Sequence, residues 1–335
     1  MSLKIPHNAR YTVMGSGSWA TAITKILTHN LDQVGWYVRE PAMADAIADT
    51  GHNPQFSSSI EFDPRKLKLY LSVNDAVKES DVLIVVIPSA YIDVWMEGLT
   101  ESLSNKFIVS AVKGIIPQSN QTILGYMHKQ FGVDESQMGF VTGPCHAEEI
   151  ALERLSFLTF SCQDEANSKA IAQVFACPFV HTITGTDVQG TEYASILKNI
   201  YAVAAGVCHG LGYGDNFLAV LVSNAHVELS RFLQQMFPAH REVNHSAYLG
   251  DLLVTCYSQF SRNRTLGTMV GKGYRVKDAQ LEMNMVAEGY YATQCMHVLN
   301  KNYQVHLPIA ETMYRILYEN ADAKNEILAL TEQLH

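Results

Sequence analysis

Short apolar runs alternate with helix-like patterns along the first half of the chain. The runs are rich in Val and Ile, which predicts strands, and the segments between them carry apolar residues at helical spacing. The predicted strands are residues 11–14, 34–38, 81–87, 107–111 and 139–142, and the predicted helices are residues 19–28, 75–79, 92–103 and 122–131. Every residue from 82 to 87 is apolar, which is typical of a parallel strand covered on both faces. This half is therefore predicted to be a doubly wound α/β domain with a mostly parallel sheet.

The pattern changes near Thr186. Two further strands, at residues 157–161 and 179–184, enclose a predicted helix at 165–175 and are expected to extend the sheet. Beyond them strand patterns disappear, and helical periodicity covers residues 188–207, 219–237, 286–300 and 309–320. We therefore expect a Rossmann-type dinucleotide-binding domain over residues 1–186 and an all-α substrate-binding domain over residues 187–335.

Composition supports a folded protein of two domains. The chain has 335 residues, of which 47% are hydrophobic and 17% charged, and this excludes a disordered or fibrous chain. Its 33 acidic and 24 basic residues give a net charge of −9, a balance that does not favour nucleic acid as a partner.

Cysteine and histidine spacing predicts no metal site. The six cysteines contain no CxxC pair and the histidines no HxxxH pair, so reduced, buried thiols are the better interpretation. The N-terminus lacks the apolar core of a signal peptide, and the longest apolar runs are far shorter than the roughly 20 residues that span a bilayer. We expect a cytoplasmic protein without a transmembrane segment.

A glycine-rich turn follows the first predicted strand. The sequence Gly15-Ser-Gly17-Ser-Trp-Ala20 matches the G-x-G-x-x-G/A pattern at the place, between strand and helix, where it binds a dinucleotide. Gly15 permits the tight turn, and Gly17 lets the backbone approach a pyrophosphate at the helix N-terminus. The alternative is an ordinary strand–helix turn, but the position favours the dinucleotide.

The end of the second strand bears on the choice of cofactor. NAD-specific folds place Asp or Glu there, whereas this chain has Arg39, whose guanidinium can pair with a 2′-phosphate. This favours NADPH. Because Glu40 is adjacent and an acidic residue here is typical of NAD-specific folds, NADH remains an alternative cofactor.

Two other strand ends carry candidate groups. Lys113-Gly114 follows a buried strand at the edge where ligands of parallel sheets bind, although a surface lysine in a turn fits the spacing equally well. Gly143-Pro144 predicts a rigid turn that could present backbone N–H groups to a ligand, although such a turn taken alone is more often structural. A nucleophile–base pair of the neighbouring Cys145 and His146 is not favoured, because adjacent side chains seldom face each other.

The helical half contains a lysine in an apolar helix and a cluster of donors. Lys198 is surrounded in sequence by Ile, Leu, Ala and Val, and desolvation there would lower its pKa towards the range useful for acid–base catalysis. The segment Ser261-Arg262-Asn263-Arg264 combines hydroxyl, guanidinium and amide donors, as a phosphate site requires. An exposed basic turn is the alternative for this segment.

Taken together, these motifs resemble those of bacterial NAD(P)-dependent sn-glycerol-3-phosphate dehydrogenases over nearly the whole chain. The matching motifs, in the family's order, are Gly15-Ser-Gly-Ser-Trp19, Lys113-Gly114, Gly143-Pro144 with Ala147 and Glu149 nearby, Lys198-Asn199, Gly250-Asp251-Leu252, Ser261-Arg262-Asn263, Ala287-Glu288-Gly289 and Leu307-Pro308-Ile309. The resemblance implies reversible reduction of dihydroxyacetone phosphate to sn-glycerol 3-phosphate with NADPH or NADH. It also implies a supply of product to glycerophospholipid synthesis and a homodimer.

The resemblance assigns roles to individual residues. It makes Lys198 the proton donor or acceptor and places Lys113 against both substrate and cofactor. On physical grounds, Asp251 could orient Lys198 or keep it protonated. The other matched substrate contacts are Gly143, Cys145, Asp251, Ser261, Arg262 and Asn263. The other matched cofactor contacts are Ser18, Trp19, Arg39, Ala147, Arg262, Val286 and Glu288.

The chain departs from the family at a few positions. Cys145 stands where the family has Ser or Thr, Ala20 replaces a glycine, and residues 245–249 replace a glycine-rich approach to Asp251. One alternative is a related dehydrogenase of the ketopantoate reductase or hydroxyisobutyrate dehydrogenase type, whose phosphate-free substrate would not need Arg262. Another is a redox sensor that binds dinucleotide without turnover, which the set of Lys113, Lys198 and Asp251 argues against.

Overall fold

The computed structural model describes residues 3–283 and 285–335. Its internal contacts divide the chain into two units. Unit 1 runs to Val112 and resumes over Gln121–Val188, and unit 2 comprises Lys113–Asn120 and Gln189–His335. The transition after residue 188 lies two residues from the expected boundary. The sequence pattern does not predict that Lys113–Asn120 belongs to the helical unit.

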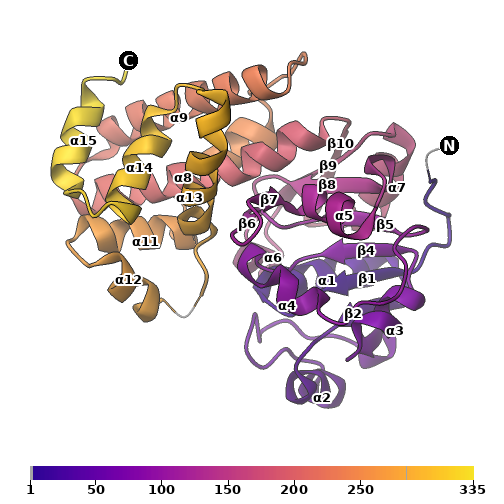
Figure 1. Ribbon diagram of the computed structural model, residues 1–335. Helices are drawn as coiled ribbons and strands as arrows, with labels where there is room; N and C mark the ends of the chain where they lie inside the picture. The colour runs from indigo at the N-terminus through magenta and orange to yellow at the C-terminus, as the bar shows by residue number, and fades with distance from the viewer. Residues whose placement is uncertain (1–2, 284) are drawn as a thin grey trace. The chain divides into compact units, whose positions relative to one another are not determined.

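Unit 1 is built on an eight-stranded sheet within the described residues (Figure 1). Its strands, in spatial order, are β10 (Val180–Gly185), β9 (Ser156–Cys162), β8 (Met138–Thr142), β5 (Phe107–Ser110), β4 (Val82–Val85), β1 (Tyr11–Met14), β2 (Val34–Tyr37) and β3 (Leu67–Tyr70). Neighbouring strands are parallel except for β8 and β9, which pair antiparallel. The mostly parallel α/β sheet is therefore confirmed. The edge strand β3 was not predicted.

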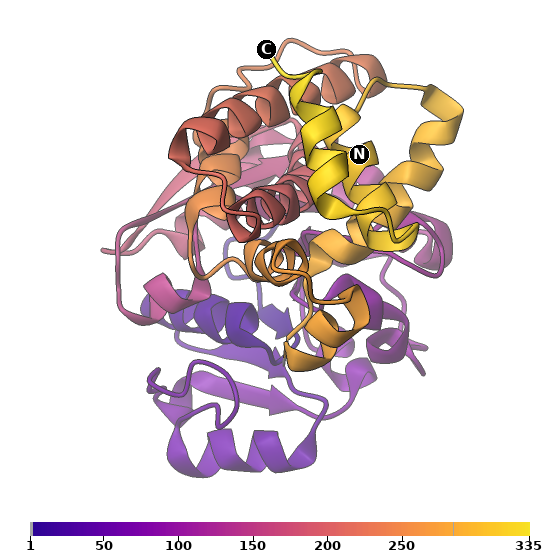
Figure 2. The same cartoon turned by 90° about the vertical axis from the view of Figure 1, so that its left-hand side faces the viewer.

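The helices of unit 1 cover this sheet. They are α1 (Ser18–Asn30), α2 (Pro41–Thr50), α3 (Val73–Lys78), α4 (Ile92–Met96), α5 (Ile123–Phe131), α6 (Ala147–Ala151) and α7 (Glu165–Phe175), and the short strand β7 (Gln121–Thr122) precedes α5. In Figure 2, which turns the view by 90°, α2 runs beside the purple edge of the sheet, where it contacts β3. Helix α4 ends well before the predicted residue 103, because Glu97 leaves the helical conformation with a ψ of 130° and Gly98 has a φ of 78°.

Unit 2 is helical, as expected. Its elements are the short strand β6 (Ile115–Ile116) and helices α8 (Val188–Gly210), α9 (Asp215–Met236), α10 (Asp251–Tyr257), α11 (Arg262–Gly271), α12 (Val276–Glu282), α13 (Glu288–Tyr303), α14 (Pro308–Tyr318) and α15 (Ala323–Thr331). The predicted long helices correspond to α8, α9, α13 and α14, whereas the shorter α10, α11, α12 and α15 were not predicted. No described helix has the length and apolar character needed to cross a bilayer.

Helix α8 is the core of unit 2. Of its 23 residues, 18 are buried, so it has no solvated face on which to place a charge. Helix α11 approaches it closely at Gly267, where a Cβ atom would lie 2.0 Å from the carbonyl oxygen of Val203. This contact holds α11, the helix that begins with Arg262 and Asn263, to the helix that carries Lys198.

Candidate active site

The glycine-rich turn of unit 1 lies between β1 and α1, as predicted. Gly15 has a φ of 131°, and a Cβ there would lie 2.7 Å from the carbonyl oxygen of Val86, so only glycine fits. Gly17 is the N-cap of α1, and nothing lies within 4 Å of the position its Cβ would occupy. The backbone N–H groups of Ser16, Gly17 and Ser18 have no acceptor among the described residues. This open, donor-lined turn fits the pyrophosphate of a dinucleotide.

Two charges of opposite sign follow β2 beside this turn. Arg39 is exposed and forms no hydrogen bond or ion pair with any residue that the structure describes. Glu40 is the N-cap of α2, and its Oε2 atom accepts a hydrogen bond from Ser16 Oγ at 3.4 Å. The guanidinium could pair with a 2′-phosphate, and the carboxylate could accept from a ribose hydroxyl.

A second turn of unit 1 follows β8. Gly143 has a φ of 130°, and a Cβ there would lie 2.4 Å from the carbonyl oxygen of Phe157. Cys145 is buried in this turn, and Ala147 is the first residue of α6. The turn therefore exists at the predicted place, and its backbone is held in a conformation that requires glycine.

Three predicted catalytic residues meet in unit 2. Lys198 lies in the middle of α8, Asp251 begins α10, and Lys113 precedes β6. Lys198 Nζ forms an ion pair with Asp251 Oδ1, and Lys113 Nζ lies 3.6 Å from Asp251 Oδ2. One carboxylate thus contacts two ammonium groups from distant parts of the chain.

Burial sets the electrostatics of this cluster. The side chains of Lys198 and Asp251 are only 5% and 2% exposed, and that of Lys113 is 18% exposed. Burial lowers the pKa of Lys198 to about 7, an effect that Asp251 opposes and the charge of Lys113 reinforces. Near neutral pH this lysine can therefore both give and take a proton.

A chain of side-chain amides supports the cluster from one side. Asn199 Nδ2 donates to the carbonyl oxygen of Lys113 at 2.6 Å, and Asn263 Nδ2 donates to Asn199 Oδ1 at 2.9 Å. Asn263 Oδ1 in turn accepts from the backbone N–H of Gly289 at 2.8 Å. Asn199, the second residue of the Lys198-Asn199 motif, had no predicted role. It holds the Lys113 backbone against α8.

Four of the predicted contact residues lie at the N-termini of helices α11 and α13 or just before them. Ser261 is the N-cap of α11, where its hydroxyl accepts from the backbone N–H of Arg264 at 3.3 Å. Arg262 is the half-buried first residue of the same helix. Val286 lies just before α13, and Glu288 is the first residue of that helix.

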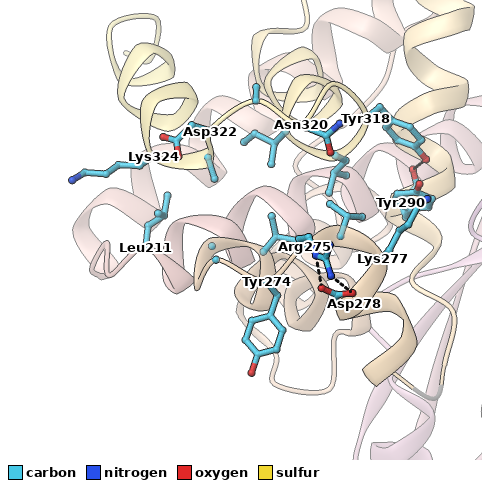
Figure 3. A pocket seen from close by; sticks show the side chains of 18 of the residues that line it. Leu211, Tyr274, Arg275, Lys277, Asp278, Tyr290, Tyr318, Asn320, Asp322 and Lys324 are labelled. Atoms are coloured by element: carbon cyan, nitrogen blue, oxygen red, sulfur yellow. Dashed lines mark hydrogen bonds and ion pairs between the residues drawn. The ribbon is translucent and has the colours of Figure 1, made fainter.

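A groove of about 870 Å³ is lined by residues of α11, α12, α13, α14 and α15 and of the segments between helices (Figure 3). Tyr274, Tyr290 and Tyr318 line it, and Arg275 forms an ion pair with Asp278 at its side. None of the predicted site residues lines this groove. The described residues also contain no group of three or more side chains suited to hold a metal ion.

Comparisons with known proteins show the family of this chain. The family model described as "NAD-dependent glycerol-3-phosphate dehydrogenase N-terminus" matches residues 10–168, and the corresponding C-terminus model matches residues 187–328. The chain is 32% identical over 321 residues to the glycerol-3-phosphate dehydrogenase [NAD(P)+] of Prosthecochloris aestuarii, covering 95% of this chain and 96% of that one.

Solved structures agree with this match. The glycerol-3-phosphate dehydrogenase from Coxiella burnetii has a TM-score of 0.88 at 25% identity, covering 98% of this chain and 100% of that one. A putative ketopantoate reductase from Ralstonia solanacearum has a TM-score of 0.59 at 12% identity, covering 95% and 98%, and this likeness shows the fold alone.

Proposed function

Because the chain belongs to the NAD-dependent glycerol-3-phosphate dehydrogenase family, we propose that unit 1 holds the dinucleotide and unit 2 supplies the proton for that family's reaction. The chain is an NAD(P)-dependent oxidoreductase. The reaction is the reversible reduction of dihydroxyacetone phosphate to sn-glycerol 3-phosphate. The match to this family sets aside the ketopantoate reductase and hydroxyisobutyrate dehydrogenase alternatives.

The observation that carries the proposal is the buried cluster of Lys198, Asp251 and Lys113. The bound nicotinamide supplies the hydride that reduces the carbonyl carbon. Lys198, with its pKa near 7, donates a proton to the carbonyl oxygen in reduction and removes it in oxidation. Asp251 orients the Lys198 ammonium, and Lys113 adds positive charge that stabilises the developing alkoxide.

Phosphate recognition is assigned to the start of α11. Arg262 offers a planar pair of donors to a phosphate, and Ser261 lies beside it at the N-cap. Asn263 uses one of its two amide protons to bind Asn199, so one donor remains for the substrate. The other proposed substrate contacts are Gly143 and Cys145, where a thiol takes the place of the family's hydroxyl.

The cofactor contacts are assigned to residues of both units. In unit 1 they are Gly15, Gly17, Ser18, Trp19, Arg39 and Ala147; in unit 2 they are Lys113, Arg262, Val286 and Glu288. The free N–H groups of the glycine-rich turn support the first set. The proposal further places the enzyme in the cytoplasm as a homodimer that feeds glycerophospholipid synthesis, as the family resemblance implies.

Absorbance at the NAD(P)H band tests the activity directly. Addition of dihydroxyacetone phosphate should produce oxidation of NADPH or NADH, whereas dihydroxyacetone without phosphate should be a much poorer substrate. A protein that binds dinucleotide but shows no phosphate-dependent oxidation with either cofactor would contradict the proposal and favour the redox-sensor alternative. The two cofactors, run side by side, decide between NADP and NAD.

A further inference from the structure

The glycine-rich turn of unit 1 is held from behind by buried side chains. Three consecutive backbone carbonyl groups of the turn each accept a hydrogen bond from a side chain elsewhere in unit 1: Gly15 from Trp36 Nε1 at 2.7 Å, Ser16 from Asn53 Nδ2 at 2.9 Å, and Gly17 from Thr21 Oγ1 at 3.0 Å. Since the carbonyl oxygens are occupied, the turn cannot present them to a bound anion. Its other face offers the unpartnered N–H groups of Ser16, Gly17 and Ser18.

Asn53 is the member of this set with no other evident purpose. It lies in the segment after α2 and is completely buried. Its amide nitrogen donates to both Ser16 O and Thr21 Oγ1, each at 2.9 Å, and therefore ties the turn to the first helical residues of α1. Its oxygen accepts from the backbone N–H groups of Gln55 and Phe56, both at 3.1 Å. Every hydrogen bond that this amide donates or accepts fixes backbone or the helix that follows the turn.

We propose that Asn53 is a positioning residue for cofactor binding: it fixes the Ser16 peptide so that the turn presents N–H groups to the dinucleotide pyrophosphate. The inference rests on the proposed dinucleotide site of unit 1. Without the Asn53 amide, the carbonyl oxygen of Ser16 is left buried with no hydrogen-bond partner, which costs free energy. Rotation of the Ser16–Gly17 peptide would relieve that cost. A rotated peptide would point its carbonyl oxygen, a partial negative charge, at the pyrophosphate.

Substitution by leucine tests the role without adding charge, because leucine has a similar volume and no polar atoms. The readout is the Kd of NADPH and NADH for the protein without substrate, measured by nucleotide fluorescence, together with steady-state constants. Asn53→Leu should raise the Kd and the dinucleotide KM about tenfold. The KM for dihydroxyacetone phosphate and kcat at saturating dinucleotide should change by less than about threefold.

Asn167 in helix α7 provides a matched control in the same unit. It is buried, donates to Leu3 O at 2.8 Å and accepts from Ile5 N at 3.1 Å, so it holds the segment that precedes β1 rather than the turn that follows it. Asn167→Leu should lower the melting temperature to a similar degree and leave the dinucleotide Kd within about twofold of wild type. An equal rise in the dinucleotide Kd for both variants would show that Asn53 acts only through the stability of unit 1, and would overturn the proposal.

Thr21→Val covers the case in which Asn53→Leu does not fold. It removes one partner of the Asn53 amide and one donor to Gly17 O, and it should raise the dinucleotide Kd about threefold. A folded Asn53→Leu or Thr21→Val protein with wild-type dinucleotide affinity would contradict the positioning role. Wild-type protein that binds no dinucleotide at all would instead refute the proposed function, so the two failures are distinguishable.

Discussion

The ammonium group of Lys198 and the carboxylate of Asp251 form an ion pair that is almost completely removed from water. A buried ion pair seldom stabilises a fold, because the cost of desolvating both charges offsets their attraction. This pair joins the middle of the most buried helix of unit 2 to the first residue of α10. Its position is therefore better explained by chemistry than by stability.

The pH dependence of turnover should report the titration of Lys198. Its pKa near 7 means that the proton donor is lost as pH rises above about 7, so kcat/KM for reduction should fall there. Oxidation needs the neutral amine and should fall below about pH 7. Because Asp251 raises the pKa of Lys198, Asp251→Asn should move both breaks to lower pH. Breaks that move upwards, or that do not move, would exclude this assignment.

Arg262→Ala should raise the KM for dihydroxyacetone phosphate about 10- to 100-fold, the equivalent of a lost charge-assisted hydrogen bond. Arg262→Lys should recover only part of the loss, because lysine cannot make the two-pronged contact. Arg275→Ala is the control, since this guanidinium is exposed and pairs with Asp278 in the groove of Figure 3. Steady-state kinetics with an unchanged KM in Arg262→Ala would remove the residue from the phosphate site.

The residues that follow β2 should decide between the two dinucleotides. Arg39→Asp should weaken NADPH more than NADH, by about 1.5–3 kcal/mol, through loss of a pairing with the 2′-phosphate. Glu40→Gln should have the opposite effect, because it removes a negative charge beside Ser16. Fluorescence titration with both nucleotides measures the ratio of the Kd for NADPH to the Kd for NADH. If the wild-type protein prefers NADH and Arg39→Asp leaves this ratio unchanged, Arg39 does not determine the choice between NADPH and NADH.

The fold was largely predictable because its strands and long helices carry strong periodic patterns. The edge strand β3 has the sequence Leu-Lys-Leu-Tyr and follows two basic residues. Its alternating pattern is too short to distinguish it from the neighbouring loop sequence. Helices α10 and α12 are short, at seven residues each, and α11 carries many polar residues at its start. Such segments depend on packing against neighbouring helices rather than on their own periodicity.

Candidate site residues could be nominated from the sequence, but the contacts between them could not. Lys198, Asp251 and Lys113 could be nominated from local setting and family resemblance, whereas the carboxylate shared by both lysines depends on tertiary structure. Asn53 could not be nominated, since nothing near it in sequence reveals that its amide reaches Ser16. The contact spans 37 positions, which no local pattern encodes.

Glu228 in α9 gives a separate prediction about stability. Its oxygens accept from Ile309 N at 2.9 Å and Ala310 N at 3.1 Å, and so cap helix α14. Burial raises the pKa of Glu228 from 4.5 to about 7. The folded state then binds the proton more tightly than the unfolded state, so this contribution is complete below about pH 4.5 and is lost as pH rises through about 7.

Thermal unfolding from pH 4.5 to 8 checks this effect in wild type and in Glu228→Gln, which cannot ionise. The wild-type melting temperature should fall over this range by at least about 2 °C more than that of the variant. Parallel curves for the two proteins would show that Glu228 keeps an ordinary pKa.

The role of Lys198 in proton transfer is tested most directly by kcat of Lys198→Met at saturating dihydroxyacetone phosphate and dinucleotide. Methionine keeps the approximate volume and removes the charge, so the protein should fold. Lys25→Met is the control, because Lys25 is also largely buried, at 15% side-chain exposure, and pairs with Glu153 in unit 1. Loss of the acid should lower kcat at least about 100-fold with dinucleotide affinity unchanged, while Lys25→Met keeps kcat within about twofold. A folded Lys198→Met protein that retains more than about a tenth of wild-type kcat would contradict the account and make Lys113 the candidate.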